Sequence, residues 1–196
     1  MKLCVFQGTF NPIHNAHLRV CEYVLKHFNF DKILFIPAFD PPHKNSNPNY
    51  SLHRLNMVKL AVKCNQKFGV SEIEYYRGGK SYTYLTIEQL YKLFNVDGKI
   101  NFIIGTDAFE KIESWYEADK LKNLLKFIVF VREDNFEISR YDYLKSKGFE
   151  FEFQSLPYEA ISSTELRELV KQNKNISSYV PKNVEEYIRK NELYKD

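Results

Sequence analysis

Residues 2–17 read Lys-Leu-Cys-Val-Phe-Gln-Gly-Thr-Phe-Asn-Pro-Ile-His-Asn-Ala-His, and this stretch decides the fold. Its apolar start predicts a short buried strand, and the residues after it predict an amphipathic helix. Gly8 suits a sharp turn and a close approach of the backbone to a ligand. His14 and His17 are three residues apart and share one face of a helical first turn. A strand, a turn and a helix start form an anion site, because free N–H groups and the helix dipole converge there.

The composition is that of a globular protein with enough length for a core, since 44% of its 196 residues are hydrophobic. The net charge of +3 fits anionic small ligands and falls short of a nucleic-acid footprint. Cys4, Cys21 and Cys64 show no metal spacing and no disulfide framework, which indicates a reducing, cytoplasmic compartment. We expect no membrane partner, because no apolar run is long enough to span a bilayer and the first residues resemble a strand.

Short apolar runs alternate with amphipathic segments along the chain. The runs predict further strands over 33–36, 70–73, 100–104, 127–131 and, at an edge, 149–153. Helical spacing predicts helices over 18–28, 52–62 with Leu52 on its core-facing stripe, 85–94, 162–171 and 182–190, with a loop over 75–81. This order implies a parallel sheet that binds ligands at the carboxyl ends of its strands. We expect an α/β, Rossmann-like doubly wound parallel sheet, a single domain over 1–196 with a small helical cap from about residue 160.

A second polar motif lies near the other end, where residues 161–167 read Ile-Ser-Ser-Thr-Glu-Leu-Arg. Ser162 and Glu165 have capping-box spacing, which predicts a helix start with exposed N–H groups. Arg167, one turn along, can reach a phosphate there through a forked, charge-assisted contact. The same residues can also be a capping box and nothing more.

Together the two motifs resemble the nucleotidyltransferase superfamily with an HxGH motif. Its members hold the phosphates of ATP with such a turn, two histidines and an Ile-Ser-Ser-Thr-x-x-Arg motif. The resemblance implies catalytic roles for His14, His17 and Arg167. It implies ATP contacts from Gly8, Thr9, Phe10, Ile161, Ser162, Ser163 and Thr164. Ala16 and Gln7 stand where the superfamily commonly has glycine.

The middle of the chain resembles the nicotinate-nucleotide adenylyltransferases in particular. The segments that carry this likeness are Lys-Ser-Tyr-Thr-Tyr-Leu-Thr over 80–86 and Gly-Thr-Asp-Ala-Phe over 105–109, followed by Trp115. In that family the tryptophan stacks on the pyridine ring, and the Tyr-Thr-Tyr segment supports the ring and its carboxylate. An indole face suits an electron-poor ring, although a loop tryptophan can also simply pack on the surface. The resemblance implies that substrate is bound by Tyr82, Thr83, Tyr84 and Trp115.

Further contacts are implied by the same resemblance. Gly105 and Asp107 are expected at the ribose or base of ATP, while Asp107 can equally cap the helix that follows it. Lys44, in a Pro-Pro-His-Lys loop, is expected to meet the substrate phosphate, its alternative being a solvated lysine. Arg132 follows the strand over 127–131 where the family commonly reads Arg-Pro-Gly, and is expected near adenine. Arg54 is interpreted as a structural ion-pair residue.

The reaction implied is transfer of the adenylyl group of ATP to nicotinic acid mononucleotide, which gives deamido-NAD and pyrophosphate in NAD biosynthesis. The attacking phosphate is already ionised, so no general base is needed. Mg²⁺ is expected to arrive with ATP, without a metal site built by the protein.

Other functions stay open on the sequence alone. Phosphopantetheine and nicotinamide-mononucleotide adenylyltransferases share the two terminal motifs. Class I aminoacyl-tRNA synthetases share the first motif, but need a lysine-rich second signature and an anticodon-binding appendage. A non-catalytic nucleotide-binding protein is a further alternative, for which Ala16 and Gln7 are the hints. We expect no nucleic-acid partner. A homo-oligomer and the degree of preference for the acid over the amide are left open.

Overall fold

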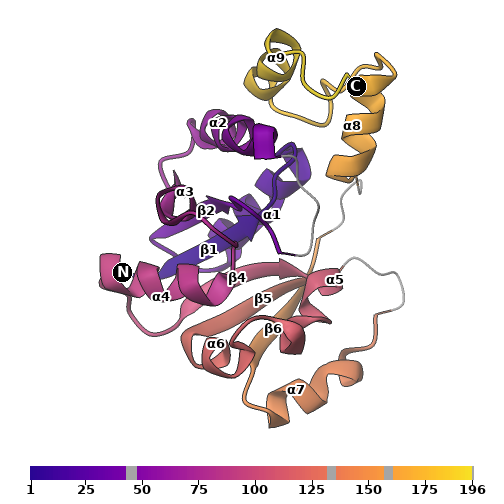
Figure 1. The fold of residues 1–196 in the computed structure, drawn as a ribbon. Helices are drawn as coiled ribbons and strands as arrows, with labels where there is room; N and C mark the ends of the chain where they lie inside the picture. Colours follow the sequence, from indigo (N-terminus) through magenta and orange to yellow (C-terminus); the bar gives the residue numbers. More distant parts are fainter. Residues whose placement is uncertain (43–47, 132–135, 157–160, 196) are drawn as a thin grey trace.

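Six parallel strands form one sheet in the computed structural model, which describes residues 1–42, 48–131, 136–156 and 161–195 (Figure 1). The strand order is β3-β2-β1-β4-β5-β6, and every neighbouring pair is parallel. The strands are β1 (Leu3–Gly8), β2 (Lys32–Pro37), β3 (Phe68–Val70), β4 (Ile100–Gly105), β5 (Leu125–Val131) and β6 (Glu150–Ser155). The order reverses between β1 and β4, so the expected doubly wound α/β sheet is confirmed, with β6 at an edge.

Helices cover both faces of this sheet. They are α1 (Asn15–His27), α2 (Ser51–Val62), α3 (Ile73–Arg77), α4 (Thr83–Leu93), α5 (Thr106–Phe109), α6 (Ala118–Leu124), α7 (Asp142–Ser146), α8 (Ser163–Lys171) and α9 (Lys182–Lys190). Short 3-10 segments are η1 (Pro48–Tyr50), η2 (Ile112–Ser114) and η3 (Ile138–Tyr141). One buried cluster joins the sheet to α1, α2, α8 and α9, and a second joins it to α4, α6 and α7.

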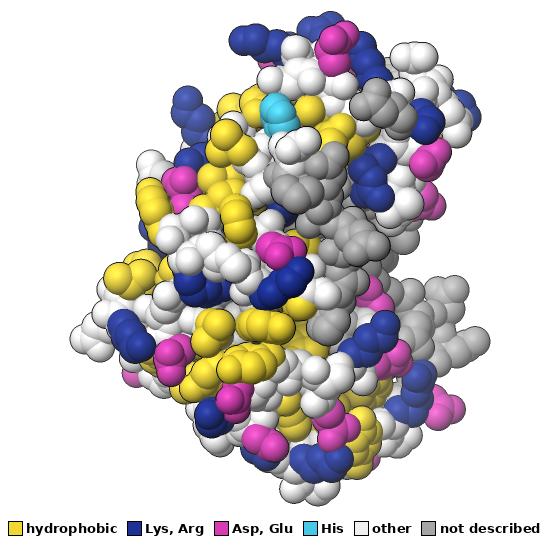
Figure 2. Space-filling view, viewed as in Figure 1, with side chains coloured by type: hydrophobic (Ala, Val, Ile, Leu, Met, Phe, Trp, Pro, Cys, Tyr) yellow, Lys and Arg dark blue, Asp and Glu magenta, His cyan; other side chains and the backbone are white. Residues whose placement is uncertain are grey.

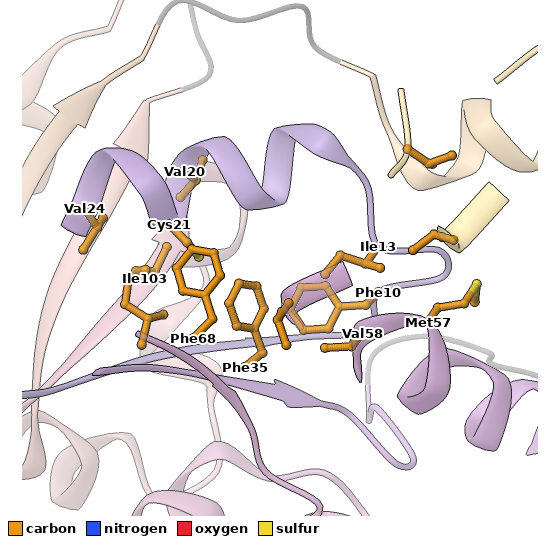
Figure 3. Close-up of a cluster of buried hydrophobic side chains, with 14 of the residues drawn as sticks. Phe10, Ile13, Val20, Cys21, Val24, Phe35, Met57, Val58, Phe68 and Ile103 are labelled. Carbon is orange, nitrogen blue, oxygen red and sulfur yellow. The ribbon is translucent and has the colours of Figure 1, made fainter. Parts of the chain in front are cut away.

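The alternation of side chains along β1 and β2 feeds both clusters. Cys4 lies in the first cluster, while Leu3 and Val5 lie in the second. In β2, Ile33 and Leu34 divide in the same way. Successive residues of a strand point to opposite faces, so a strand buried on both faces is apolar throughout. Figure 3 shows the first cluster, where the rings from the strands meet the inner side of α1.

The C-terminal helices pack on the same cluster as the first turn of the chain. Leu166 of α8 and Val184 of α9 are fully buried in it. The backbone N–H of Asn15 at the start of α1 donates to the carbonyl of Tyr179 (2.7 Å). In Figure 1, α8 and α9 lie at the same end of the molecule as α2. We therefore propose that the chain folds as one unit, with residues from about 160 onward as its helical cap.

Three local expectations were wrong. The third strand is Phe68–Val70 instead of 70–73, because Phe68 pairs with β2 and places its ring in the core. Ile73 then begins α3, which replaces the first part of the loop expected over 75–81. Leu52 is 62% exposed and lies off the buried side of α2.

The surface carries charges of both signs. On the face drawn in Figure 2, Lys and Arg side chains lie among Asp, Glu and hydrophobic side chains over most of the described surface. Large exposed hydrophobic side chains include Tyr76 and Leu93, which are 86% and 67% exposed. Within the described residues, none of the helices has the length and apolar character needed to cross a membrane.

The three cysteines differ sharply in accessibility, which gives a direct test of the core. Cys4 and Cys21 are fully buried, and burial raises the pKa of both thiols, whereas Cys64 is exposed. Thiolates are the reactive form, so a soluble aromatic disulfide should modify one thiol rapidly in the native protein at about pH 8 and all three after unfolding. Cys64→Ser should abolish the rapid phase. Rapid modification of two or more native thiols would contradict this packing.

Candidate functional site

A cavity of about 750 Å³ opens at the carboxyl ends of β1 and β4, where the strand order reverses. This is the expected place for a ligand in such a sheet, and the volume suits a small molecule of nucleotide size. The cavity brings together residues that are far apart in the sequence. Those singled out from the sequence that line it are Gly8, Thr9, Phe10, His14, His17, Tyr82, Thr83, Gly105, Asp107, Trp115, Ile161, Ser162, Ser163, Thr164 and Arg167. Ala16 and Gln7 line it as well.

The remaining site predictions are placed differently. Tyr84 is not among the described residues that line the cavity. Its hydroxyl donates to the Glu88 carboxylate (3.2 Å) on the same helix. Lys44 and Arg132 lie outside the described residues, so their roles stay predictions.

The first turn owes its shape to Phe10 as much as to Gly8. Gly8 is the last residue of β1, and a Cβ atom there would meet the Phe10 ring at 3.0 Å. The residue with a positive φ is Phe10 itself, at 48°. Glycine is therefore needed here to let this ring lie against the backbone, rather than to adopt a left-handed conformation.

Phe10 and the two histidines form a stacked group. The Phe10 ring is 2% exposed and meets the ring of His17 edge-to-face, with centroids 5.1 Å apart. The rings of His14 and His17 stack at 3.6 Å. The backbone N–H of His14 donates to Nδ1 of His17 (3.2 Å). Because Nδ1 accepts this bond, a neutral His17 carries its proton on Nε2, the tautomer that can donate to a phosphate oxygen.

The start of α8 is docked on the same turn. The predicted capping box is confirmed, with Glu165 N donating to Ser162 Oγ (3.1 Å) and Ser162 N donating to the Glu165 carboxylate (2.7 Å). These bonds to Ser162 hold the pKa of Glu165 below its usual range. Ser163 Oγ donates to the carbonyl of Pro12 (3.0 Å). Arg167 donates to the carbonyl of Asn11 (2.9 Å), so it links α8 to the turn.

The C-terminal segment supports the turn from another side. The hydroxyl of Tyr194 donates to the side-chain oxygen of Asn11 (2.7 Å). The ring of Tyr194 is 7% exposed and stacks on Tyr50 with centroids 5.3 Å apart. Sequence reasoning missed this contact, because nothing local connects residues 11 and 194. A signal in the sequence is the apolar pair Leu193 and Tyr194 in an otherwise polar C-terminal segment.

An aromatic wall lines another part of the cavity. Tyr82 stacks on Tyr116 with ring centroids 4.6 Å apart. Trp115 is half-buried and meets Phe102 edge-on at 6.0 Å. Tyr116 was missed from the sequence, although it directly follows the tryptophan that was singled out. Tyr82 is the N-cap residue of α4, because this helix begins at Thr83, two residues before the predicted start at residue 85.

At the end of β4, Gly105 is the N-cap residue of α5 and Asp107 lies in its first turn. The alternative role of Asp107 as the cap is therefore wrong. Asp107 is exposed and lines the cavity, where its carboxylate can accept hydrogen bonds from a ligand hydroxyl.

Arg54 holds the ends of β1 and β2 together. Its guanidinium is fully buried and donates to the carbonyls of Thr9 (2.8 Å), Ala38 and Phe39 (3.0 Å). Burial lowers the pKa of Arg54. Among the described residues it forms no ion pair, so the ion-pair interpretation was wrong, and backbone dipoles take that role.

Comparison with known proteins shows the family to which this chain belongs. A family model described as cytidylyltransferase-like matches residues 5–169. A protein of Fusobacterium nucleatum named probable nicotinate-nucleotide adenylyltransferase is 40% identical, over 97% of this chain and 98% of its own length. A Lactococcus lactis protein of the same name is 38% identical, over 99% of this chain and 95% of its own. The chain belongs to the nicotinate-nucleotide adenylyltransferase family.

Solved structures of other proteins share the fold of this chain. The Plasmodium falciparum nicotinic acid mononucleotide adenylyltransferase complexed with NaAD has a TM-score of 0.79 at 22% identity, over 98% of this chain and 96% of that one. The same protein complexed with APC has a TM-score of 0.73 at 21% identity. At these identities the likeness concerns the fold.

The Tyr194–Asn11 bond can be tested by Tyr194→Phe. The change removes one hydroxyl and leaves the buried ring in place, so it should lower the free energy of unfolding by about 0.5–1.5 kcal/mol. Urea unfolding followed by circular dichroism measures this difference. Tyr179→Phe is the matched control, because its ring is only partly buried in the same cap. Equal effects of the two changes would contradict a special role for Tyr194.

Proposed function

We propose that the protein transfers the adenylyl group of ATP to nicotinic acid mononucleotide, releasing pyrophosphate and forming deamido-NAD for NAD biosynthesis. The observation that carries the proposal is that one cavity joins the two phosphate-type motifs to an aromatic wall. The names of the curated relatives and of the structural neighbours support the same reaction.

ATP is assigned to the side of the cavity formed by β1, α1 and α8. The N-termini of α1 and α8 both open there, and a helix N-terminus favours anions through its N–H groups and dipole. Thr9, His14 and His17 supply polar side chains from the turn, and Ser163, Thr164 and Arg167 supply them from α8. Gly105 and Asp107 at the end of β4 are assigned to the nucleoside of ATP.

The mononucleotide is assigned to the side formed by α4 and the aromatic wall. Tyr82, Trp115 and Tyr116 offer ring faces to a pyridine ring. Thr83 is the first residue of α4, so the positive end of that helix dipole lies beside these rings. A nicotinate carboxylate gains from this field, whereas the neutral nicotinamide gains much less. We therefore infer a preference for the acid. Lys44 stays our proposed contact to the incoming phosphate.

The chemistry needs positioning and charge stabilisation more than proton transfer. The mononucleotide phosphate attacks the α-phosphorus of ATP in line, the bond to the bridging oxygen breaks, and pyrophosphate leaves with that bonding pair. Bound side by side, the two substrates gain the advantage of a unimolecular reaction. Donors on His14, His17 and Arg167 would stabilise the charge that spreads over the phosphoryl oxygens.

A divalent cation enters as part of the nucleotide substrate. Within the described residues, no group of three or more His, Cys, Asp or Glu side chains is arranged to hold a metal ion. ATP binds Mg²⁺ through its phosphates, and this ion keeps several waters when bound. We propose Mg²⁺–ATP as the substrate form. A cytoplasmic location is proposed on the three free thiols. No nucleic-acid partner and an open homo-oligomeric state remain predictions.

The deciding experiment measures pyrophosphate release by the purified protein with Mg²⁺ and ATP. Separate reactions receive nicotinic acid mononucleotide, nicotinamide mononucleotide or phosphopantetheine, and mass spectrometry identifies each product. The proposal expects turnover chiefly with the acid, at a kcat/KM about tenfold or more above that with the amide, because a charge–dipole contact is lost with the amide. Turnover chiefly with phosphopantetheine would overturn the assignment of the aromatic wall. No turnover with any acceptor would favour the non-catalytic alternative.

His17→Ala tests the phosphate side of the site. If Nε2 of His17 donates to a phosphoryl oxygen in the transition state, kcat should fall by the equivalent of about 2–4 kcal/mol, while the KM for the mononucleotide stays within about twofold. His27→Ala on the same helix is the control, since that ring lies at the far end of α1 against Tyr23. A kcat close to that of the wild type would remove His17 from the mechanism.

A further inference from the structure

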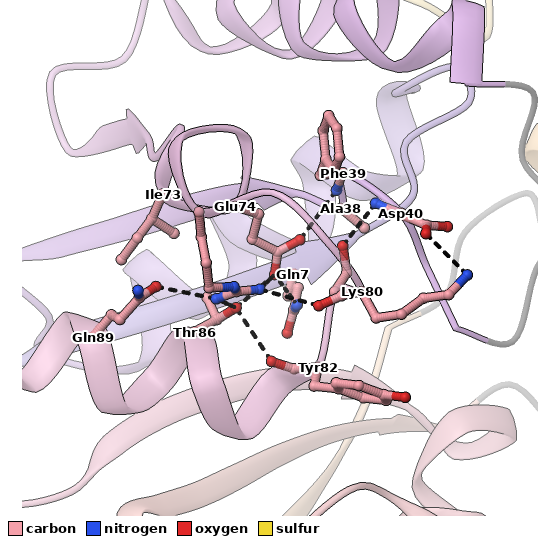
Figure 4. Close-up of polar contacts among 12 residues, drawn as sticks. Gln7, Ala38, Phe39, Asp40, Ile73, Glu74, Lys80, Tyr82, Thr86 and Gln89 are labelled. Carbon is pink, nitrogen blue, oxygen red and sulfur yellow. Dashed lines mark hydrogen bonds and ion pairs between the residues drawn. The ribbon is translucent and has the colours of Figure 1, made fainter.

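Glu74 is a buried carboxylate at the edge of the site. It lies on α3, is 1% exposed, and is not among the described residues that line the cavity. A buried carboxylate is costly unless donors surround it. Here Gln7 Nε2 donates to Oε1 (2.6 Å), Thr86 Oγ1 donates to the same oxygen (2.7 Å), and the Phe39 N–H donates to Oε2 (3.1 Å). Figure 4 shows the carboxylate between these three groups.

Each donor belongs to a segment that continues into the wall of the cavity. Gln7 is the penultimate residue of β1 and lines the cavity beside the first turn. Phe39 lies two residues after β2 and leads to residues 41–42, which line the cavity. Thr86 lies in the first turn of α4, three residues after Thr83, which lines the aromatic side of the cavity with Tyr82. One carboxylate therefore fixes the relative positions of three segments that are separate in the chain.

Arg77 completes the network from the same short helix. It donates to Thr86 Oγ1 (3.0 Å), to Gln89 Oε1 (3.1 Å) and to the carbonyl of Lys80 (3.4 Å). Its guanidinium is 3.9 Å from the Glu74 carboxylate. The Thr86 hydroxyl thus accepts from the cation while it donates to the anion, and such chains of bonds strengthen one another where water is excluded. The loop that leads into α4 is held at both ends.

A second set of bonds joins the same two segments nearer to solvent. The Asp40 N–H donates to Ser81 Oγ (2.9 Å), and the Ser81 N–H donates to the carbonyl of Asp40 (2.9 Å). Lys80 pairs with the Asp40 carboxylate (2.9 Å), but these side chains are 52% and 42% exposed. Exposed ion pairs contribute little, so this junction is constrained by the buried carboxylate of Glu74 together with the two Asp40–Ser81 hydrogen bonds.

The ATP side of the cavity has supports of its own. Arg54 holds the carbonyl of Thr9, and both Arg167 and Tyr194 hold Asn11. None of these three bonds involves Glu74. A disturbance at Glu74 should therefore be felt mainly at the loop after β2 and at the start of α4.

We propose that Glu74 is a positioning residue for the mononucleotide half of the cavity, because it sets the distance between the segment after β2 and the N-terminus of α4. The inference rests on the proposed function for its choice of substrate. In this proposal Glu74, which is not among the described residues that line the cavity, places Tyr82 and Thr83 against the pyridine ring and its carboxylate.

The test compares steady-state kinetics of the wild type, Glu74→Gln, Thr86→Val and Glu72→Gln with each substrate varied in turn. Glu74→Gln keeps the shape but turns an amide NH₂ toward one of the existing donors. Thr86→Val removes only the bridging hydroxyl and no charge, so it serves where the first variant folds poorly. Glu72, two residues away, pairs with Lys59 at the surface and is the matched control. Calorimetric titration with the mononucleotide and thermal unfolding accompany the kinetics.

We expect Glu74→Gln to raise the KM and the Kd for the mononucleotide about tenfold or more, since small misplacements in a site cost this much. The KM for ATP should stay within about twofold, because its contacts have separate supports. Thr86→Val should change the same constants in the same direction by less, and Glu72→Gln should match the wild type. Unchanged KM values with only a lower melting temperature, or equal rises for both substrates, would overturn the proposal. A wild type that does not use the mononucleotide would instead defeat the proposed function, so the wild type is measured first.

Discussion

The buried guanidinium of Arg54 is the constraint on which the site depends. It reaches from α2 to the carbonyls of Thr9, Ala38 and Phe39, which follow the carboxyl ends of β1 and β2. Parallel pairing ends at this point, with Gly8 opposite Pro37 as the last pair and one further bond from the Ala38 N–H to the Gly8 carbonyl (2.8 Å), so the segments beyond it need other supports. A guanidinium presents five donors in a rigid fork, and several carbonyl dipoles can share its charge. The turn and the neighbouring loop are therefore held as one body.

The buried carboxylate of Glu74 and the buried guanidinium of Arg54 are joined through the backbone of Phe39. Its carbonyl accepts from Arg54, and its N–H donates to Glu74. Both charges are satisfied largely by groups on the backbone and by neutral side chains, which is how a folded chain can keep them away from water. Glu74 extends the connection to Gln7 and Thr86. The position of the phosphate turn thus depends on Arg54 and that of α4 on Glu74, and neither of these two residues is among the described residues that line the cavity.

The sequence predicted what is decided locally or by burial on both faces of the sheet. The apolar runs predicted five of the six strands to within two residues at each end, and the spacing of Ser162 and Glu165 predicted the capping box. The prediction from the sequence failed where strand pairing decides the boundary of an element. Val70 and Ile73 suit either a strand or a helix start, and only the pairing with β2 shows that the strand ends at Val70. Likewise, the sequence did not show that α4 begins at Thr83, which places Tyr84 outside the cavity lining while Tyr116 stacks on Tyr82.

The departure from the superfamily pattern at Gln7 bears on whether the protein is a catalyst. Taken from the sequence alone, a larger residue in place of glycine suggests a damaged phosphate turn. In the structure its amide is directed to Glu74, 67 positions away, and supplies that carboxylate with one of its donors. Gln7 therefore lines the cavity while its amide supports Glu74, and the turn keeps Thr9, His14 and His17 along the cavity. Both phosphate motifs line the cavity beside the Glu74 network, and Gln7 donates within that network, so the residue at position 7 does not support the non-catalytic alternative.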